Sequence, residues 1–164
     1  MSVQLTRREK ISLRRSIRSF KGDWEKMEVR KGISANNERT KLATFADENG
    51  NWHFFAFQNE RLVGSRTIQE ISTQVHSAWV LRNILVRRKG QSIGSLLTAE
   101  ALEKARQNDA PYVTVGIFQN EAWQQHLIRE LGGQETGFRS GGVNWSRSSN
   151  YGREKWKRFL LRES

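Results

Sequence analysis

The chain has 164 residues, of which 36% are hydrophobic, and its six Trp and eight Phe favour a folded domain with a sizeable core over disorder. It contains no Cys, which excludes disulfides, thiolate metal sites and cysteine nucleophiles, and its three His lack HxxxH or HExxH spacing, which argues against catalytic zinc. No apolar run reaches about 18 residues and the beginning of the chain lacks an apolar signal core, so we expect a soluble, cytoplasmic protein.

Positive charge is concentrated at the two ends of the chain. The net charge is +11, from 28 Lys and Arg against 17 Asp and Glu. Residues 1–31 carry ten basic and four acidic side chains, residues 139–164 carry seven and two, and residues 32–138 carry eleven of each. A basic surface built from both ends indicates a polyanionic partner, with nucleic acid first and an acidic protein second. A surface that is basic only for solubility is the alternative.

The N-terminal segment predicts a short strand followed by two helices. Residues 3–5 read as the strand, and Thr6 and Glu9 have the spacing of a capping box, which marks a helix start. Apolar residues then recur at spacings of three and four, interrupted by a Gly-Asp pair, so we expect helices over 7–21 and 23–30. The basic residues that mostly fall off this apolar stripe include Arg14, Arg15 and Arg18.

Three strands joined by short turns are expected next. After a polar loop at 31–41, residues 42–46 and 52–57 flank an Asn-Gly pair, which is a strong hairpin signal. A further short turn leads into residues 61–71, which predict the third strand. Strands linked by short turns favour antiparallel pairing over a Rossmann-like arrangement.

The stretch from 77 to 106 joins a strand, a glycine-bearing turn and a helix. Residues 78–86 (AWVLRNILV) predict a mostly buried strand, 87–94 (RRKGQSIG) form a basic turn, and apolar residues at helical spacing follow. A helix start of this kind holds phosphate, because its first N–H groups are free and the helix dipole is positive there. The phosphate loop of NTPases and the GxGxxG fingerprint are both excluded by the glycine spacing and the residues that follow.

The remaining chain predicts one strand, one helix and a basic hairpin. Residues 112–118 (YVTVGIF) read as a buried strand and 120–131 as an amphipathic helix that ends at a Gly-Gly C-cap. The basic C-terminal hairpin would include a last strand at 153–161. Aromatic side chains on it could stack on bases or belong to the core; the two assigned to substrate binding are Trp145 and Trp156.

The turn after the central strand resembles the acetyl-CoA pyrophosphate loop of the GNAT superfamily of N-acetyltransferases, roughly V-x-P-x-x-[QR]-x-x-G-x-[GA]. Ile84 stands at the Val position, Lys89 at the Gln/Arg position and Gly94 at the closing Gly/Ala position, whereas Val86 replaces Pro and Ser92 replaces Gly. The sequence NERLVGSRTI similarly resembles the third strand of the family. The alternative is a plain strand–turn–helix. The resemblance implies a cofactor site formed by Ile84, Leu85, Val86, Lys89, Gly90, Gln91, Ser92, Ile93, Gly94, Ser95 and Asn120.

The resemblance also implies the fold. We expect a GNAT-like α/β fold, with a mixed, largely antiparallel twisted sheet that is flanked by helices and splayed at the central strand. Residues 1–164 would form a single domain, with basic N-terminal helices at 6–31, a cofactor-binding core at 52–138 and a basic hairpin at 139–164. The first helices of this fold help to form the acceptor side, so the expected substrate-binding arginines are Arg14, Arg15 and Arg18.

The residues that would perform acid–base chemistry depart from the family pattern. Ile128 occupies the place of the Tyr that protonates the departing thiolate, and the central strand has no carboxylate. Glu70 is the nearest carboxylate that could deprotonate an amine. His126 would lie on another face of its helix, and an ordinary surface role is its alternative. The catalytic candidates are therefore Glu70, Asn120 and His126, with no metal.

Together, these features predict an acetyl-CoA-dependent N-acyltransferase that acts on an amine on or near nucleic acid or a nucleic-acid-associated protein. The alternative is a basic nucleic-acid- or partner-binding module that keeps the fold without turnover, which the missing Tyr and carboxylate favour. Acetylation of a cationic antibiotic is less favoured, because such a substrate requires an acidic pocket.

Overall fold

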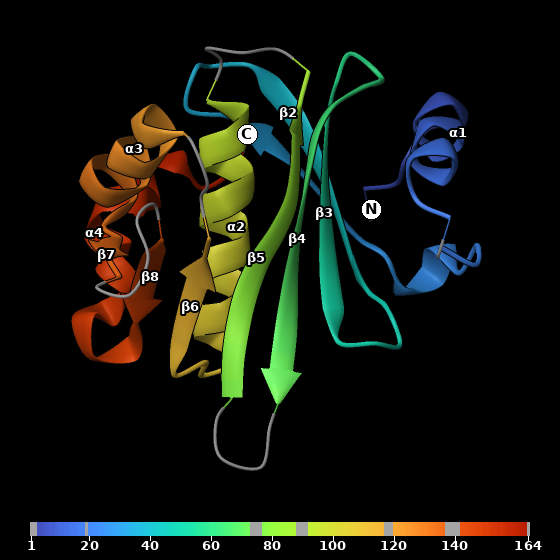
Figure 1. The fold of residues 1–164 in the computed structure, drawn as a ribbon. Coiled ribbons are helices and arrows are strands. Elements are labelled where there is room, and N and C mark those ends of the chain that lie inside the picture. Colours follow the sequence, from blue (N-terminus) through green and yellow to red (C-terminus); the bar gives the residue numbers. More distant parts are fainter. Residues whose placement is uncertain are drawn as a thin grey trace.

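A sheet of eight strands forms the centre of the computed structural model, which describes residues 3–18, 20–72, 77–87, 92–116, 120–136 and 142–163 (Figure 1). Neighbouring strands are antiparallel except β5 and β6, which run parallel, so the predicted mixed, largely antiparallel sheet is confirmed. In spatial order the strands are β1 (Glu28–Ile33), β2 (Arg39–Ala46), β3 (Asn51–Gln58), β4 (Arg61–Ser72), β5 (Ser77–Val86), β6 (Tyr112–Val115), β8 (Val143–Ser146) and β7 (Gln134–Glu135).

Helices lie on both faces of this sheet. α1 lies at the side of β3 and β4 that faces away from α2, as Figure 1 shows. Among the described residues, none of the helices has the length and apolar character that crossing a membrane requires. The helical segments are α1 (Arg7–Ser16), η1 (Trp24–Lys26), α2 (Ile93–Gln107), α3 (Glu121–Leu131), η2 (Arg147–Gly152), α4 (Arg153–Trp156) and η3 (Lys157–Phe159).

The two hydrophobic cores are separated by the sheet and follow from the alternation of side chains along β3. Phe54 belongs to the core that includes Leu97 of α2. Phe55 belongs to the other core, which includes Leu13 of α1. Successive side chains of a strand point to opposite faces, so a strand covered on both faces must be apolar at consecutive positions. This explains the continuous run FFAF in β3.

The N-terminal predictions are partly confirmed. The capping box is present: Glu9 N–H donates to Oγ1 of Thr6, and Thr6 N–H donates to the carboxylate of Glu9. The other expectations are corrected, because residues 3–5 are not a strand, α1 ends at Ser16, and 28–33 form β1 instead of the end of a second helix. The β1 sequence EVRKGI is mostly polar because only part of this edge strand is buried, so it lacks a strand signature.

The predicted last strand at 153–161 is wrong, because this segment forms α4 and η3. Trp156 and Phe159 both belong to the core, and their spacing of three residues matches a helical turn. Apolar side chains fell on both faces of the predicted strand, so its alternation was not a true two-residue period. A bridge between Ile33 and Arg162 then joins the C-terminal segment to β1.

Trp145 and Trp156 are core residues, which corrects their assignment to a stacking surface. They are 1% and 0% exposed. Their indole N–H groups donate to the main-chain oxygens of Leu131 and Tyr151, at 2.8 and 2.7 Å respectively. A base cannot stack on a ring that the protein already covers, so these residues hold the C-terminal segment against the sheet.

Candidate functional site

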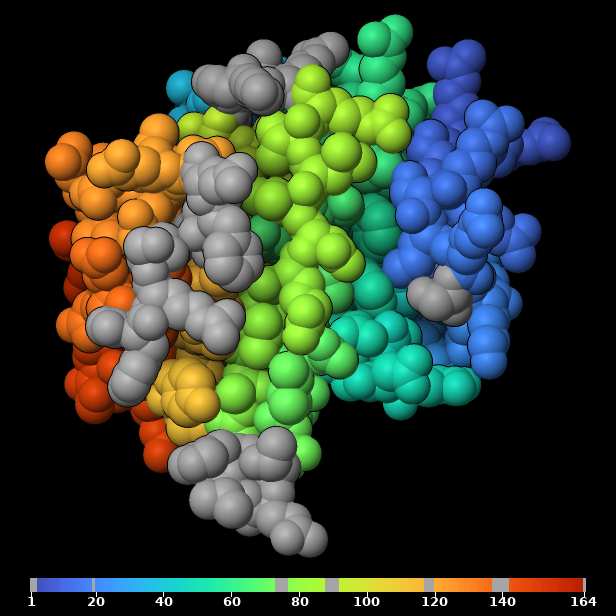
Figure 2. All heavy atoms as spheres, viewed as in Figure 1, coloured from blue at the N-terminus to red at the C-terminus, as the bar shows by residue number. Residues whose placement is uncertain are grey.

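The central strand β5 is uncovered over its second half. Among the described residues, β5 pairs with the parallel strand β6 only at Trp79↔Val113 and Val80↔Thr114, and beyond these positions it pairs with β4 alone. Ile84 and Leu85 are 39% and 43% exposed, although they lie in the middle of the sheet. Figure 2 shows atoms of β5 at the surface between those of α3 and those of α1. An open apolar strand edge of this kind suits an extended ligand.

A β-bulge lies at the same place on β5. Ser65 pairs with Leu85 and Thr67 pairs with Arg82, so three residue steps on β5 oppose two on β4. Asn83 lies within the bulge and has a φ of +41°, a conformation that costs about 1 kcal/mol or more for a residue other than glycine. Because a bulge leaves one residue out of the ladder, it redirects backbone groups of β5 away from β4.

The first turn of α2 adjoins this strand. Leu96 N–H donates to the carbonyl of Ser92 at 2.9 Å, so the three preceding N–H groups have no acceptor within the helix. Ser92 has a φ of +59°, the left-handed conformation that glycine adopts most easily. A methyl group on Gly94 would lie 3.4 Å from Val86 and 3.5 Å from Ile84, so helix start and strand end are in contact. Together they offer N–H donors and a positive dipole to an anion.

The structure places some of the predicted cofactor residues at the open strand end and helix start, and others elsewhere. Ile84, Leu85 and Val86 form the end of β5, and Ser92, Gly94 and Ser95 lie at the start of α2. The side chain of Ile93 is 1% exposed and belongs to the core, so only its main chain remains available. The remaining residues of the predicted loop, which lie outside the described part of the chain, are Lys89, Gly90 and Gln91.

Two aromatic residues of α3 cover the first turn of α2. The ring of Trp123 would lie 3.3 Å from a methyl group on Gly94, and the imidazole of His126 stacks on Trp123 with centroids 5.2 Å apart. Nε2 of His126 is 2.6 Å from Oγ of Ser95, a side chain that is 3% exposed. Burial, followed by the charge of Arg158, lowers the pKa of His126, so its imidazole is neutral at pH 7.

The other two catalytic candidates lie apart from this contact. The side chain of Asn120 caps α3, accepting a hydrogen bond from the N–H of Trp123 at 3.0 Å. Glu70 is exposed and pairs with Trp79 near the far end of β4. It is three residues along the strand from Thr67, which pairs at the near end of the bulge, or about 10 Å at the rise of an extended chain. The structure therefore does not bring Glu70 together with the bulge on β5.

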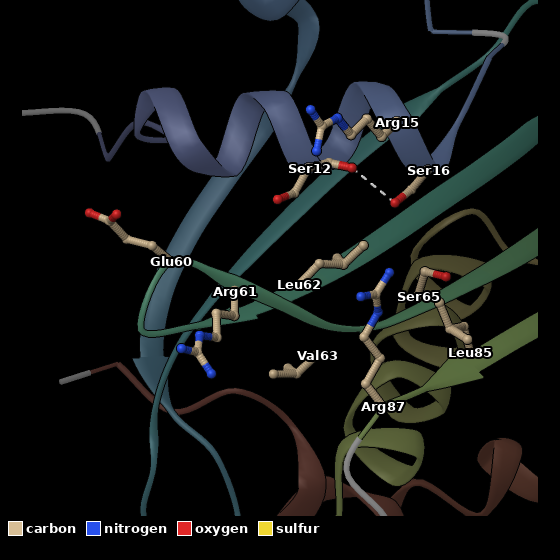
Figure 3. Close-up of a pocket in the computed structure, with 10 residues that line it drawn as sticks. All are labelled: Ser12, Arg15, Ser16, Glu60, Arg61, Leu62, Val63, Ser65, Leu85 and Arg87. Carbon is tan, nitrogen blue, oxygen red and sulfur yellow. Dashed lines mark hydrogen bonds between the residues drawn. The ribbon is translucent and has the colours of Figure 1, made fainter.

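A pocket opens on the α1 side of the same strand end. Its volume is about 690 Å³, and it lies between α1 and the neighbouring ends of β4 and β5 (Figure 3). Of the three arginines expected near an acceptor, Arg15 lines this pocket, whereas Arg14 and Arg18 are exposed and do not. The lining residues are Ser12, Arg15, Ser16, Glu60, Arg61, Leu62, Val63, Ser65, Leu85 and Arg87.

A carboxylate–imidazole–hydroxyl relay lies on the same face of the sheet as this pocket. Oδ2 of Asp47 is 2.9 Å from Nε2 of His53, and Nδ1 of His53 is 3.2 Å from Oγ1 of Thr67. Burial raises the pKa of Asp47, but hydrogen bonds from His53, Asn51 and Asn49 outweigh it, so the pKa lies below its ordinary 3.8. Thr67 pairs with Arg82 beside the bulge.

The sequence did not predict this relay, because its three residues come from a turn and two different strands. Thr67 and the pocket residue Ser65 are two positions apart on β4 and therefore point to the same face, about 7 Å from each other. The imidazole of His53 stacks on Phe45 with centroids 4.9 Å apart, which fixes the ring. The only sequence signal was the position of His53 in a strand, three residues after an Asn-Gly turn.

A buried arginine lies on the opposite face of β4. Arg66 is 3% exposed, and burial lowers its pKa to about 10. Its Nε and Nη2 have no hydrogen-bond partner among the described residues. Gly64, two positions earlier, packs against Ile93 and Leu97, so the same alternation directs Arg66 toward the α2 side. Unpaired buried donors destabilise the fold.

Comparison with protein-family models gives no match, and comparison with curated proteins gives none either. Solved structures do match. A GNAT-family acetyltransferase from Listeria monocytogenes is 15% identical, with 56% of this chain and 61% of that chain covered and a TM-score of 0.46. A GNAT-family acetyltransferase from Elizabethkingia anophelis, solved with acetyl-CoA bound, is 15% identical, with 59% and 76% covered and a TM-score of 0.49.

The likeness is greater for a cAMP-binding acyltransferase from Mycobacterium smegmatis. It is 7% identical, with 82% of this chain and 56% of that chain covered and a TM-score of 0.59. The match thus spans less than two thirds of the length of both the Mycobacterium and the Listeria proteins. The chain has the GNAT-like α/β fold, and its structural neighbours include GNAT acetyltransferases at low sequence identity. The match to the Mycobacterium structure supports the fold alone and leaves the substrate open.

Proposed function

We propose that this protein is an acetyl-CoA-dependent N-acyltransferase. The observation that carries the proposal is the open, bulged end of β5 beside the first turn of α2. An apolar strand edge with redirected backbone groups and a helix start with free N–H groups fit a ligand that has an extended arm and phosphates at its end. When bound, acetyl-CoA supplies an activated acetyl thioester.

The residues at this site would hold and orient the cofactor. Its extended arm would be held by the exposed side chains of Ile84 and Leu85 and the bulged main chain at Asn83. Its phosphates would be held by the N–H groups of Gly94 and Ser95, at the helix start that Trp123 covers from α3. Direct transfer between two bound molecules depends mainly on this positioning, so the chain does not require a nucleophile of its own.

The chain formed by Asp47, His53 and Thr67 removes the proton of the acceptor amine. With the Nε2 proton directed to Asp47, Nδ1 accepts the hydroxyl proton of Thr67. Thr67 oxygen can then take a proton from an ammonium group in the pocket while its own proton moves to His53. The carboxylate stabilises the resulting imidazolium, as in other carboxylate–histidine pairs. This relay takes the role that sequence reasoning gave to Glu70.

The basic ends of the chain are proposed to attract a polyanion, either an acceptor or a molecule that carries it. Arg14 lies in α1 and Arg18 just after it, and both are exposed. Exposed Lys155 and Lys157 of the C-terminal segment contribute positive charge from the opposite side of the sheet (Figure 1). A cytoplasmic location is part of the proposal. The second candidate, a binding module without turnover, has the same basic ends and differs only in making no use of β5.

Calorimetric titration of acetyl-CoA, with inorganic polyphosphate as the CoA-free control, tests this proposal. Leu85→Asp places a carboxylate on the exposed strand, and Ile11→Asp is a matched control, since the side chains are 43% and 44% exposed. We expect saturable binding at one site, at least about tenfold weaker in Leu85→Asp and unchanged in Ile11→Asp. No saturable binding, or binding equal to that of polyphosphate, would support the binding module instead.

A further inference from the structure

Three arginines from separate elements converge on the pocket between α1 and the sheet. Arg15 comes from the last turn of α1, Arg61 from the first position of β4, and Arg87 directly follows β5. Figure 3 shows Arg15 on the helix side of the pocket and the other two on the sheet side. Among the described residues, none of the three forms an ion pair with a carboxylate. Their charges are therefore available to a ligand.

The pocket has a net positive charge even though it contains an acidic residue. Among the lining residues that the structure describes, Glu60 is the only carboxylate, and its Oε2 lies 4.0 Å from Nε of Arg8, which is outside the lining. Three positive charges thus oppose one carboxylate that already faces another arginine. A cationic ligand is disfavoured here, whereas a carboxylate or phosphate matches the planar fork of a guanidinium group.

The pocket also reaches the site proposed for acetyl transfer. Its wall includes Leu85, the exposed residue beside the bulge, and Ser65, which pairs with Leu85. Arg87 N–H donates to the carbonyl of Val63 at 2.9 Å, which extends the β4–β5 ladder and fixes the main chain of Arg87. Because Leu85 and Arg87 are two positions apart, their Cα atoms are about 7 Å from each other.

We propose that this pocket binds the acceptor through an anionic group, so that the acceptor is a small primary amine that also carries a phosphate or a carboxylate. The arginines hold the anion, and the amine, a few bonds away, lies beside Leu85 and within reach of Thr67. A volume of about 690 Å³ suits a small molecule. This inference rests on the proposed acyltransferase function and specifies its acceptor.

The test measures CoA release from acetyl-CoA with a panel of amines. Phosphoethanolamine carries a phosphate, β-alanine carries a carboxylate, ethanolamine carries neither, and a 5′-amino oligonucleotide represents a polyanion. We expect kcat/KM for at least one of the two small anionic amines to exceed that for ethanolamine by about tenfold or more. Which of the two is preferred identifies the anion. Equal use of ethanolamine, or use of the oligonucleotide alone, would overturn the proposal.

Variants connect that preference to the arginines. Arg87→Gln and Arg15→Gln should each lower kcat/KM for the preferred anionic amine by about tenfold while changing that for ethanolamine less than about twofold. Arg7→Gln is the matched control, because Arg7 is an exposed residue of α1 that does not line the pocket. An unchanged preference in both pocket variants would contradict the assignment.

A binding measurement separates failure of this inference from failure of the proposed function. Acetyl-CoA is titrated into the wild type and Arg87→Gln, and phosphoethanolamine, β-alanine and ethanolamine are then titrated separately into each. If acetyl-CoA does not bind the wild type, the acyltransferase proposal fails. In another outcome, acetyl-CoA binds both proteins equally well, while neither protein binds phosphoethanolamine or β-alanine more tightly than it binds ethanolamine. In that case only the proposal of an anionic acceptor is rejected.

Discussion

Gly64 links the fold to the proposed cofactor site, so replacing it tests both. A methyl group at Gly64 would lie 2.7 Å from Cγ2 of Ile93, 2.9 Å from Cδ1 of Leu97 and 2.9 Å from the carbonyl oxygen of Leu85. The last contact is with main chain, which cannot rotate away. We therefore expect Gly64→Ala to separate α2 from the sheet and to lower the free energy of unfolding by about 1–3 kcal/mol.

Gly94→Ala is the matched change on the facing helix. Its methyl group would meet Trp123, Val86 and Ile84 at 3.3–3.5 Å, which is tight but attainable with small shifts. Alanine also favours a helix over glycine by up to about 1 kcal/mol. We expect Gly94→Ala to unfold within about 1 kcal/mol of the wild type and to keep its acetyl-CoA affinity, because the loop that the chain resembles has Gly or Ala at this position. Gly94→Glu should instead bind acetyl-CoA at least about tenfold more weakly, because it places bulk and a negative charge beside the helix start.

Urea unfolding and calorimetric titration of these variants complete this test. Wild-type stability in Gly64→Ala would refute the close packing of α2 on β4. Wild-type acetyl-CoA affinity in Gly94→Glu, with the fold intact, would refute the placement of the cofactor at the start of α2.

Four further predictions concern charged and aromatic residues. Asp47→Asn should lower the free energy of unfolding at pH 7, and its difference from the wild type should shrink as the pH falls through the lowered pKa of Asp47, below 3.8. Urea unfolding at several pH values measures this difference, and a difference that does not change with pH would contradict a hydrogen-bonded, charged Asp47. His126→Gln should gain stability relative to the wild type as the pH falls below 6.5, because His126 is protonated at a higher pH in the unfolded chain than in the folded protein. Melting temperatures measured against pH test this, and the same pH dependence in both proteins would contradict it. Arg66→Met should raise the free energy of unfolding by about 1–3 kcal/mol in urea, and a loss would mean that its donors are paired. Trp145→Phe should cost about 1–3 kcal/mol without changing oligonucleotide affinity, and weaker binding by fluorescence anisotropy would restore a stacking role.

The sequence was sufficient for the elements whose patterns are long and regular. The strand predicted at 78–86 and the helix predicted from 93 onward match β5 and α2, because an apolar, β-rich run favours a strand and apolar residues at the helical period favour a helix. The expectation that this strand is mostly buried was wrong, since Trp79 and Leu81 are its buried residues and 82–85 are exposed. The sequence patterns also failed at β1 and α4. β1 is an edge strand with a polar sequence, and α4 is too short for a periodic pattern to emerge from four residues.

The site was harder to predict than the fold because it depends on contacts between distant segments. The resemblance at Ile84 and Gly94 pointed to the strand end and helix start. It gave no signal that Trp123 covers that helix, or that Arg15, Arg61 and Arg87 converge on one pocket. These residues are separated by dozens of positions along the chain, and they come together through the pairing of β4 with β5 and the packing of α1 and α3.

The most direct test of the account is to map acetyl-CoA binding on the backbone amides by ¹⁵N NMR, with polyphosphate as the control ligand. If acetyl-CoA binds between β5 and the start of α2, we expect it to shift the amide signals at 82–86, at 92–95 and at Trp123, and we expect polyphosphate to leave them unchanged. Shifts confined to the basic residues of α1 and the C-terminal segment, equal for both ligands, would contradict the account and would make the charged ends the functional part of the molecule.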